Sequence, residues 1–136
     1  MADHQNAFCQ IERMTGMKDG LRRDLMLIDR KRALQEINIS EKMFNELLNV
    51  FIEQTEPALK ILEEKAEKRK YEEIRKKAHF IGGSAGNLRI EGIRSLAKEI
   101  ELEAMEKREI SVIKSHIGKL RNDFEKVKEE VSGGQQ

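Results

Sequence analysis

Four stretches of the sequence repeat apolar residues at the spacing of one helix face, and this repetition constrains the fold more strongly than any other feature. The most regular stretch lies near the C-terminus and consists of Ile113, Ile117, Leu120, Phe124, Val127 and Val131. Intervals of three and four residues place these side chains on one stripe of an α-helix, and such a stripe is normally buried against other elements. The pattern therefore predicts helices that pack on one another.

Three earlier stretches have the same pattern. Their apolar positions are Phe44, Leu47, Leu48, Phe51, Leu59, Ile61, Leu62 and Ala66 in the first, Ile74, Ala78, Ile81, Ala85 and Leu88 in the second, and Ile93, Leu96, Ala97, Ile100 and Ala104 in the third. Pro57 interrupts the first stretch, and because proline removes a helical hydrogen bond, we expect one long helix that bends there. Either Asn38 or Ser40 can cap the start of this helix, and Asn38 with Glu41 suits a capping box.

A shorter helix is predicted ahead of these four. Asp29 is a good N-cap, Ala33, Leu34 and Ile37 supply an apolar face, and the helix should stop by Asn38. The expected fold is all-α, an antiparallel four-helix bundle with an additional short N-terminal helix. We expect residues 25–131 to form the bundle domain, residues 1–24 a partly ordered extension, and residues 132–136 a disordered tail.

Composition excludes several classes of function. The net charge is only +1 although 38% of the residues are charged, so there is no electrostatic argument for binding nucleic acid or an anionic membrane. No apolar run reaches the roughly 18 residues that span a membrane, and the N-terminus lacks the layout of a signal peptide. Cys9 is the only cysteine and the three histidines are widely separated, so we expect no metal site. A cytoplasmic monomer is the expectation.

His79 lies in the second stretch, roughly 140° around the helix from the centre of the apolar stripe. The side of the helix that it occupies also carries Glu72, Arg75, Lys76, Gly82, Gly83 and Gly86. An interior glycine costs about 0.8–1 kcal/mol of helix stability relative to alanine, so three glycines on one face need a reason. They would leave the imidazole accessible to a bulky partner. Alternatively, the segment GGSAGN is a helix end followed by a loop, and His79 is an ordinary exposed residue.

The segment AHFIGGSAGNL is similar to the phosphoacceptor motif of histidine-containing phosphotransfer (HPt) domains, His-x-hydrophobic-Lys-Gly-Ser-[Ala/Ser]-x-x-hydrophobic. The positions that match in register are His79, Ile81, Gly83, Ser84, Ala85 and Leu88. The likeness extends from about Ile28 to Val131, over most of the chain. HPt domains are four-helix bundles, so the resemblance and the periodicity predict the same fold.

The resemblance implies a phosphoryl carrier of a two-component phosphorelay. His79 would accept a phosphoryl group, expected on Nε2, from the aspartate of a receiver domain and pass it to another receiver. Response-regulator receiver domains or a hybrid histidine kinase would be the partners. The receiver would bring Mg²⁺, and this chain would need no cofactor of its own. It also lacks a glycine-rich phosphate loop followed by Lys-Ser/Thr, so we expect a carrier rather than an enzyme with its own nucleotide site.

One position departs from the motif, because the usual lysine three residues after the histidine is Gly82. Arg75 and Lys76, one turn before His79, are candidates to supply the missing positive charge, unless both are simply solvated. The predicted phosphoryl and receiver surface therefore consists of Arg75, Lys76, Gly82, Gly83, Ser84 and Gly86 around His79. Within it, Ser84 lies nearer the buried flank and is expected to be mainly structural.

The remaining polar residues have simpler interpretations. Phe80 either fills a gap to a neighbouring helix or offers apolar area for docking. His116 is expected to be a plain surface histidine, and Glu99, Glu101 and Glu103 a solvated face. The alternative function, which the Gly82 departure leaves open, is a helical scaffold that binds receiver or kinase domains without phosphotransfer.

Overall fold

The computed structural model describes residues 26–134, and within them it contains five helices and no strand. Their bounds are α3 Arg30–Ile37, α4 Glu41–Glu67, α5 Tyr71–Asn87, α6 Glu91–Met105 and α7 Ile110–Gly134. The prediction of an all-helical fold is confirmed. The predicted extension at residues 1–24 lies outside the described residues, as do His4 and Cys9.

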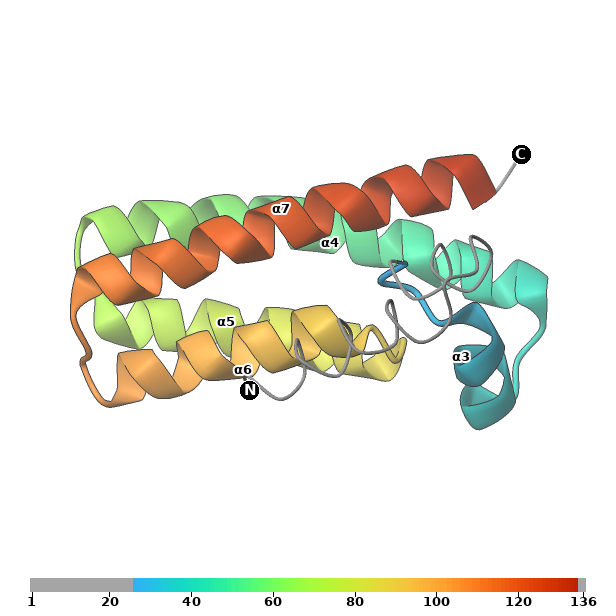
Figure 1. Ribbon diagram of the computed structural model, residues 1–136, viewed down its shortest axis with the longest axis horizontal. Helices are drawn as coiled ribbons and strands as arrows, with labels where there is room; N and C mark the ends of the chain where they lie inside the picture. Colours follow the sequence, from blue (N-terminus) through green and yellow to red (C-terminus); the bar gives the residue numbers. More distant parts are fainter. Residues whose placement is uncertain (1–25, 135–136) are drawn as a thin grey trace, which may run out of the picture.

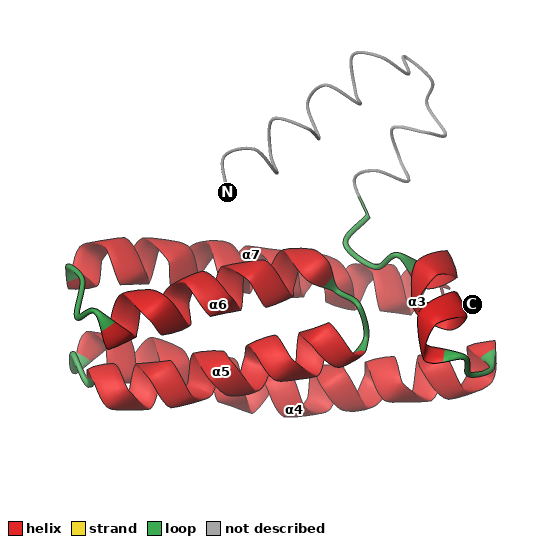
Figure 2. Cartoon of the chain, turned by 90° about the horizontal axis from the view of Figure 1, so that it is seen from below, coloured by secondary structure: helices red, strands yellow, loops and turns green. Residues whose placement is uncertain are grey.

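The four long helices form an antiparallel bundle, in which each helix runs opposite to the next along a common axis (Figures 1 and 2). α4 packs on α5 and α7, and α6 packs on the same two helices, so the four helices surround one core. Nearly all positions of the predicted stripes are buried in this core, with Leu47 and Ile61 the exceptions at 37% and 36% exposed. The short helix α3 lies at one end of the bundle, beside the start of α4 (Figure 1).

Side-chain caps define the start of α3 and of α4. The Asp29 carboxylate accepts a hydrogen bond from the backbone N–H of Arg32, and the Ser40 hydroxyl accepts one from Met43, both at 3.1 Å. Asn38 does not cap α4, because it ends α3 in the left-handed conformation with a φ of 61°. The predicted capping box of Asn38 with Glu41 is therefore wrong, and Ser40 takes the capping position instead.

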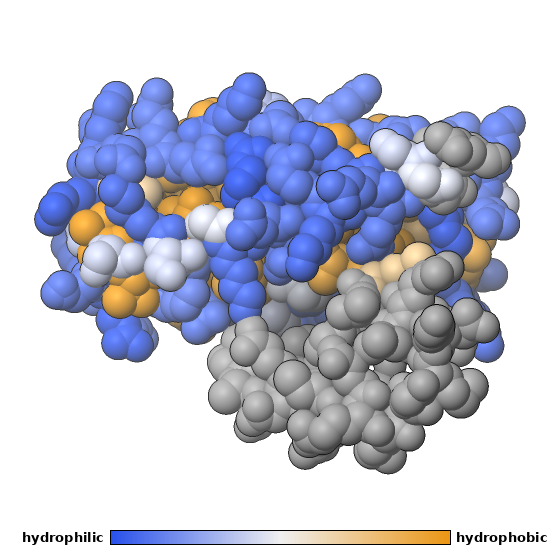
Figure 3. All heavy atoms as spheres, turned by 45° about the horizontal axis from the view of Figure 1, so that its top comes forward, coloured by the Kyte–Doolittle hydropathy of each residue, from blue (hydrophilic) through white to orange (hydrophobic). Residues whose placement is uncertain are grey.

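α4 is continuous through Pro57, as predicted for a single long element. A network of charged side chains joins its outer face to α7: Arg121 contacts Glu56 at 2.9 Å and Glu63 at 3.0 Å, and Lys128 contacts Glu56 at 3.1 Å. These carboxylates hold the pKa of Arg121 well above its ordinary value, and hydrogen bonds from Arg121 and Lys128 lower the pKa of Glu56. The face turned to the viewer in Figure 3 is accordingly mostly hydrophilic.

The ends of the helices correct two predictions. α5 runs through the whole GGSAGN segment to Asn87, so the alternative of a loop there is wrong. The turn after it has Arg89 in the left-handed region, and the N–H of Ile90 bonds back to the carbonyl of Ala85 at 2.9 Å, which satisfies the end of the helix. α7 continues to Gly134, three residues beyond the end at Val131 that the sequence pattern predicts.

None of the helices between residues 26 and 134 combines the length and the apolar character that crossing a membrane requires.

Candidate functional site

His79 lies at the middle of α5, and its side chain is 70% exposed. The buried stripe of α5 faces the core through Ile74, Ala78, Ile81 and Ala85, so His79 is turned outward, as its position on the helix predicts. Its Nδ1 atom lies 3.1 Å from Oε2 of Glu101, which is on the neighbouring helix α6. The imidazole is therefore held on one side and open on the other.

This contact favours one tautomer of the imidazole. A carboxylate only accepts hydrogen bonds, so this contact is a hydrogen bond in the tautomer whose Nδ1 carries the proton and donates to Glu101. In the neutral imidazole the other nitrogen, Nε2, then has the free lone pair. The hydrogen bond that Nδ1 donates to Glu101 thus leaves Nε2 free to act as a nucleophile.

Glu101 itself is buried, with only 7% of the residue exposed. Its second oxygen, Oε1, lies 3.8 Å from Nζ of Lys98, one turn earlier on α6. The carboxylate is therefore placed between an imidazole and an ammonium group. The prediction that Glu99, Glu101 and Glu103 form a solvated face is wrong for Glu101 and Glu103, because each of these two is 7% exposed.

The two cations proposed from the sequence differ in their surroundings. Arg75 forms a two-pronged contact with Glu72, through Nε at 3.1 Å and Nη2 at 2.7 Å. The hydrogen bonds that Arg75 donates to Glu72 raise the pKa of Arg75 and lower the pKa of Glu72, so the two charges largely compensate each other. Lys76 is exposed and forms no ion pair with any other residue of the described chain. Of the two, Lys76 is thus the more available to an anion.

The three glycines of α5 have different neighbours. A Cβ atom on Gly82 would lie 3.4 Å from the Cβ of Ala97 on α6, and one on Gly86 would lie 2.9 Å from Cδ of Arg94. Gly82 and Gly86 therefore both face α6: a methyl group at Gly82 would contact Ala97, and one at Gly86 would require the flexible Arg94 side chain to shift. A Cβ atom on Gly83 would have no neighbour within 4 Å. Only Gly83, one turn after His79, leaves open space beside the imidazole.

Replacing Gly83 with alanine is expected to stabilise the fold and to slow a reaction that needs a partner close to His79. The stabilisation should be about 0.8–1 kcal/mol, because alanine favours the helix and the new methyl group meets no atom. Gly118→Ala on α7 is a matched control, since a Cβ atom there also has no neighbour within 4 Å. Denaturant unfolding should show equal stabilisation of both variants. Equal phosphotransfer rates in the two variants would mean that the space at Gly83 has no role.

Two further side chains flank the histidine. Phe80 is 42% exposed, so of its two predicted roles the structure favours apolar area at the surface over filling a gap between helices. Ser84 is half-buried, which agrees with a mainly structural role. The sequence motif alone does not predict how exposed Phe80 and Ser84 are, because it does not say which flank of α5 the neighbouring helix covers.

His116 is not a plain surface residue. Its side chain on α7 is 28% exposed, and Nδ1 lies 2.9 Å from the carboxylate oxygens of Glu103 on α6. Nε2 lies 4.0 Å from Oε2 of Glu99, one turn before Glu103. The sequence spacing does not reveal this group, because Glu103 and His116 are 13 residues apart and lie on different helices.

Glu101 and Lys98 are the functional candidates that the sequence interpretation missed. The alternation of Glu99, Glu101 and Glu103 does contain a signal, since residues two apart on a helix point to nearly opposite sides. Glu101 faces α5, and the other two glutamates face α7. The three glutamates therefore do not share one solvated face.

Comparison with protein families gives one match, in which the model of the Hpt domain family covers residues 46–130. This is more than half of the chain, and it contains α5 with His79 as well as α6 with Glu101. Comparisons with curated proteins and with solved structures give no match. The arrangement of the bundle, the outward histidine at the middle of α5 and the family match all agree, and the chain belongs to the Hpt domain family.

Proposed function

We propose that the protein is a histidine phosphotransfer protein, which accepts a phosphoryl group from the aspartate of a receiver domain on His79 and passes it to another receiver. Membership of the Hpt domain family implies a role related to phosphotransfer in two-component signalling, and members of this family act as phosphocarrier modules. The observation that supports His79 as the acceptor is its 70% exposed side chain, with Nδ1 bonded to the buried Glu101 and Nε2 left without this contact.

The proposed reaction is an in-line displacement at phosphorus. The lone pair of His79 Nε2 attacks, a P–N bond forms, and the P–O bond to the aspartate of the receiver breaks, which leaves that aspartate as a carboxylate. Positive charge develops on the imidazole ring, and the Glu101 carboxylate at Nδ1 stabilises it. In the transfer to the second receiver, the P–N bond breaks and a P–O bond to the aspartate of that receiver forms. Catalysis then rests on positioning and charge stabilisation, with Mg²⁺ expected on the receiver.

The second part of the proposal concerns the positive charge that the family motif places at Gly82. A lysine at this position would start close to Ala97, where α6 approaches α5. Lys98 comes from α6 instead, is 57% exposed and lies beside Glu101. We propose that Lys98 supplies positive charge to the phosphoryl group, with Lys76 as the cation on α5 and Arg75 a weaker contributor because Glu72 compensates its charge.

Replacing Lys98 with glutamine is expected to slow phosphotransfer roughly three- to tenfold, because a cation near the transferring group stabilises its charge but is partly screened at an exposed site. Lys60→Gln on α4 is the matched control, since Lys60 is also exposed but lies outside α5 and α6. Transfer rates from a phosphorylated receiver at two salt concentrations measure the effect. If Lys76→Gln slows transfer and Lys98→Gln does not, the charge comes from α5.

The experiment that tests the proposed function is transfer of label from a panel of phosphorylated receiver domains to the full chain. The wild type is expected to become labelled on histidine, and His79→Gln is expected to give no label. His116→Gln is the matched control, because it removes another structured histidine that lies on α7. Absence of label from every receiver, together with binding of one of them, would favour the scaffold alternative.

A further inference from the structure

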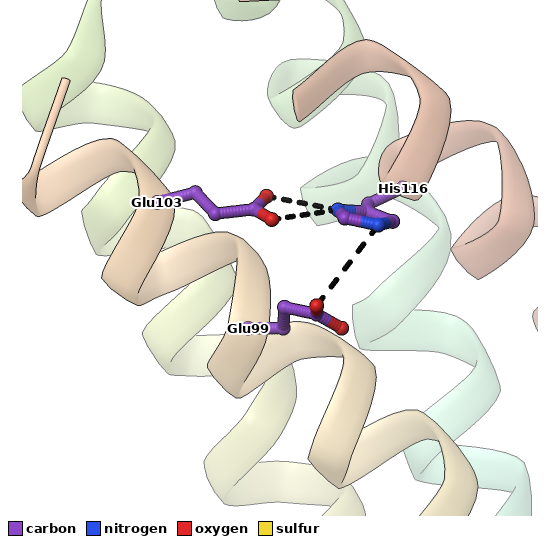
Figure 4. Close-up of side chains that lie close together, drawn as sticks. All are labelled: Glu99, Glu103 and His116. Atoms are coloured by element: carbon purple, nitrogen blue, oxygen red, sulfur yellow. Dashed lines mark hydrogen bonds and ion pairs between the residues drawn. The ribbon is translucent and has the colours of Figure 1, made fainter. Parts of the chain in front are cut away.

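A second cluster of chemically active side chains lies on the other side of α6 from Glu101. Glu99 and Glu103 are one turn apart on α6, and both point toward His116 on α7 (Figure 4). One ligand atom from each of the three residues can be chosen so that all three lie within 4.8 Å of one another. Nothing in the proposed phosphotransfer uses this cluster.

The charges of the cluster are not balanced by neighbouring cations. Within the described part of the chain, no lysine or arginine forms an ion pair with Glu99 or Glu103, and His116 is the sole partner of both. Glu103 is 7% exposed, so its charge is poorly solvated. The two carboxylates approach different ring nitrogens, Glu103 at Nδ1 and Glu99 nearer Nε2, so an ion would take one of these nitrogens and one oxygen from each glutamate.

One of the two contacts of His116 is not a hydrogen bond. Nε2 of His116 and Oε2 of Glu99 are 4.0 Å apart, which is too long for a hydrogen bond. Two ligands bound to one zinc ion at about 2.1 Å each are roughly 3.4 Å apart in a tetrahedral site. An ion shared by Nδ1 of His116 and Glu103 would be reached by rotation of the Glu99 side chain, which is 32% exposed and is not held by a hydrogen bond from any described residue.

We propose that Glu99, Glu103 and His116 bind a divalent transition metal ion, with Zn²⁺ as the best candidate, and that the ion fastens α6 to α7. One imidazole nitrogen with two carboxylates is a donor set that zinc accepts, with water in the remaining position. Mg²⁺ and Ca²⁺ prefer oxygen ligands only, so they fit the imidazole poorly. The site is structural, because Glu101 and His79 lie on the α5 side of α6.

The test is thermal unfolding and calorimetric titration of the full chain with ZnCl₂, with MgCl₂ as the comparison. Every arm carries Cys9→Ser, because a free thiolate is itself a strong zinc ligand. At 100 times the dissociation constant, Zn²⁺ is expected to raise the Tm by roughly 8–12 °C with one equivalent bound, and Mg²⁺ to have no such effect. His79→Gln is the matched control and should respond like the parent.

Two variants decide the result. His116→Gln removes the nitrogen ligand, and Glu99→Gln removes an oxygen ligand that makes no hydrogen bond, so the second variant should fold normally. Both are expected to weaken zinc binding at least about tenfold and to lose most of the Tm shift. The proposal is overturned if the parent shows no shift, or if both variants keep it. In that case the His116–Glu103 contact is only an ion pair between two helices.

Discussion

Replacing Glu101 with glutamine is expected to slow phosphotransfer to His79 by about 10- to 100-fold, while the fold and the accessibility of the imidazole are kept. In the proposed reaction the carboxylate holds the proton on Nδ1 and stabilises the positive charge that develops on the ring. A neutral amide can do neither well, and its NH₂ group can donate to Nδ1 and place the proton on Nε2, the atom that has to attack. Single-turnover transfer from a phosphorylated receiver measures the loss.

Glu103→Gln is the matched control for this variant. Glu103 is on the same helix, is equally buried and also bonds the Nδ1 atom of a histidine, but that histidine is His116 on α7. Its replacement should leave the transfer rate within about twofold of the wild type, because it touches none of the reacting groups. Equal slowing in both variants would assign the effect of Glu101 to the stability of α6 rather than to His79.

The largest expected effect on stability is that of Phe124→Ala, about 3–5 kcal/mol of the free energy of unfolding. The Phe124 side chain on α7 is fully buried, and its ring meets that of Phe51 on α4 edge to face, with centroids 6.2 Å apart. Nζ of Lys128 also lies 5.3 Å from the centre of the ring. Truncation removes all of these contacts and leaves a cavity between two long helices.

Phe80→Ala is the control, because Phe80 is the same residue type with 42% of its surface exposed. Its stability change should be within about 0.5 kcal/mol of zero. Denaturant unfolding of both variants measures the difference. A loss for Phe124→Ala no greater than that for Phe80→Ala would contradict the packing of α4 on α7 described above.

The fold could be predicted from the sequence because each helix buries its own stripe. The spacing from Ile113 to Val131 is enough to define the buried face of α7, whatever packs on it. The choice between Asn38 and Ser40 as a cap could not be made in the same way, since both residue types suit the position. It depended on whether Asn38 was already used to end α3.

Only part of the candidate site could be predicted from the sequence. The outward position of His79 follows from its angle to the stripe of α5, a local property of one helix. The carboxylate that contacts His79 is Glu101 on α6, 22 positions away. The sequence does not say which face of α6 meets α5. For the same reason the sequence predicts that Gly82 leaves space for a partner beside His79, whereas in the structure Gly82 faces Ala97 of the neighbouring helix.

The measurement that tests the central claim most directly is the identification of the phosphorylated atom. The chain, with its three histidines ¹⁵N-labelled, is phosphorylated by a receiver, and its imidazole nitrogens are followed by NMR. The phosphoryl group is predicted on Nε2 of His79, with the proton retained on Nδ1 and bonded to Glu101. A phosphoryl group on Nδ1 of His79, or on His4 or His116, would contradict the account.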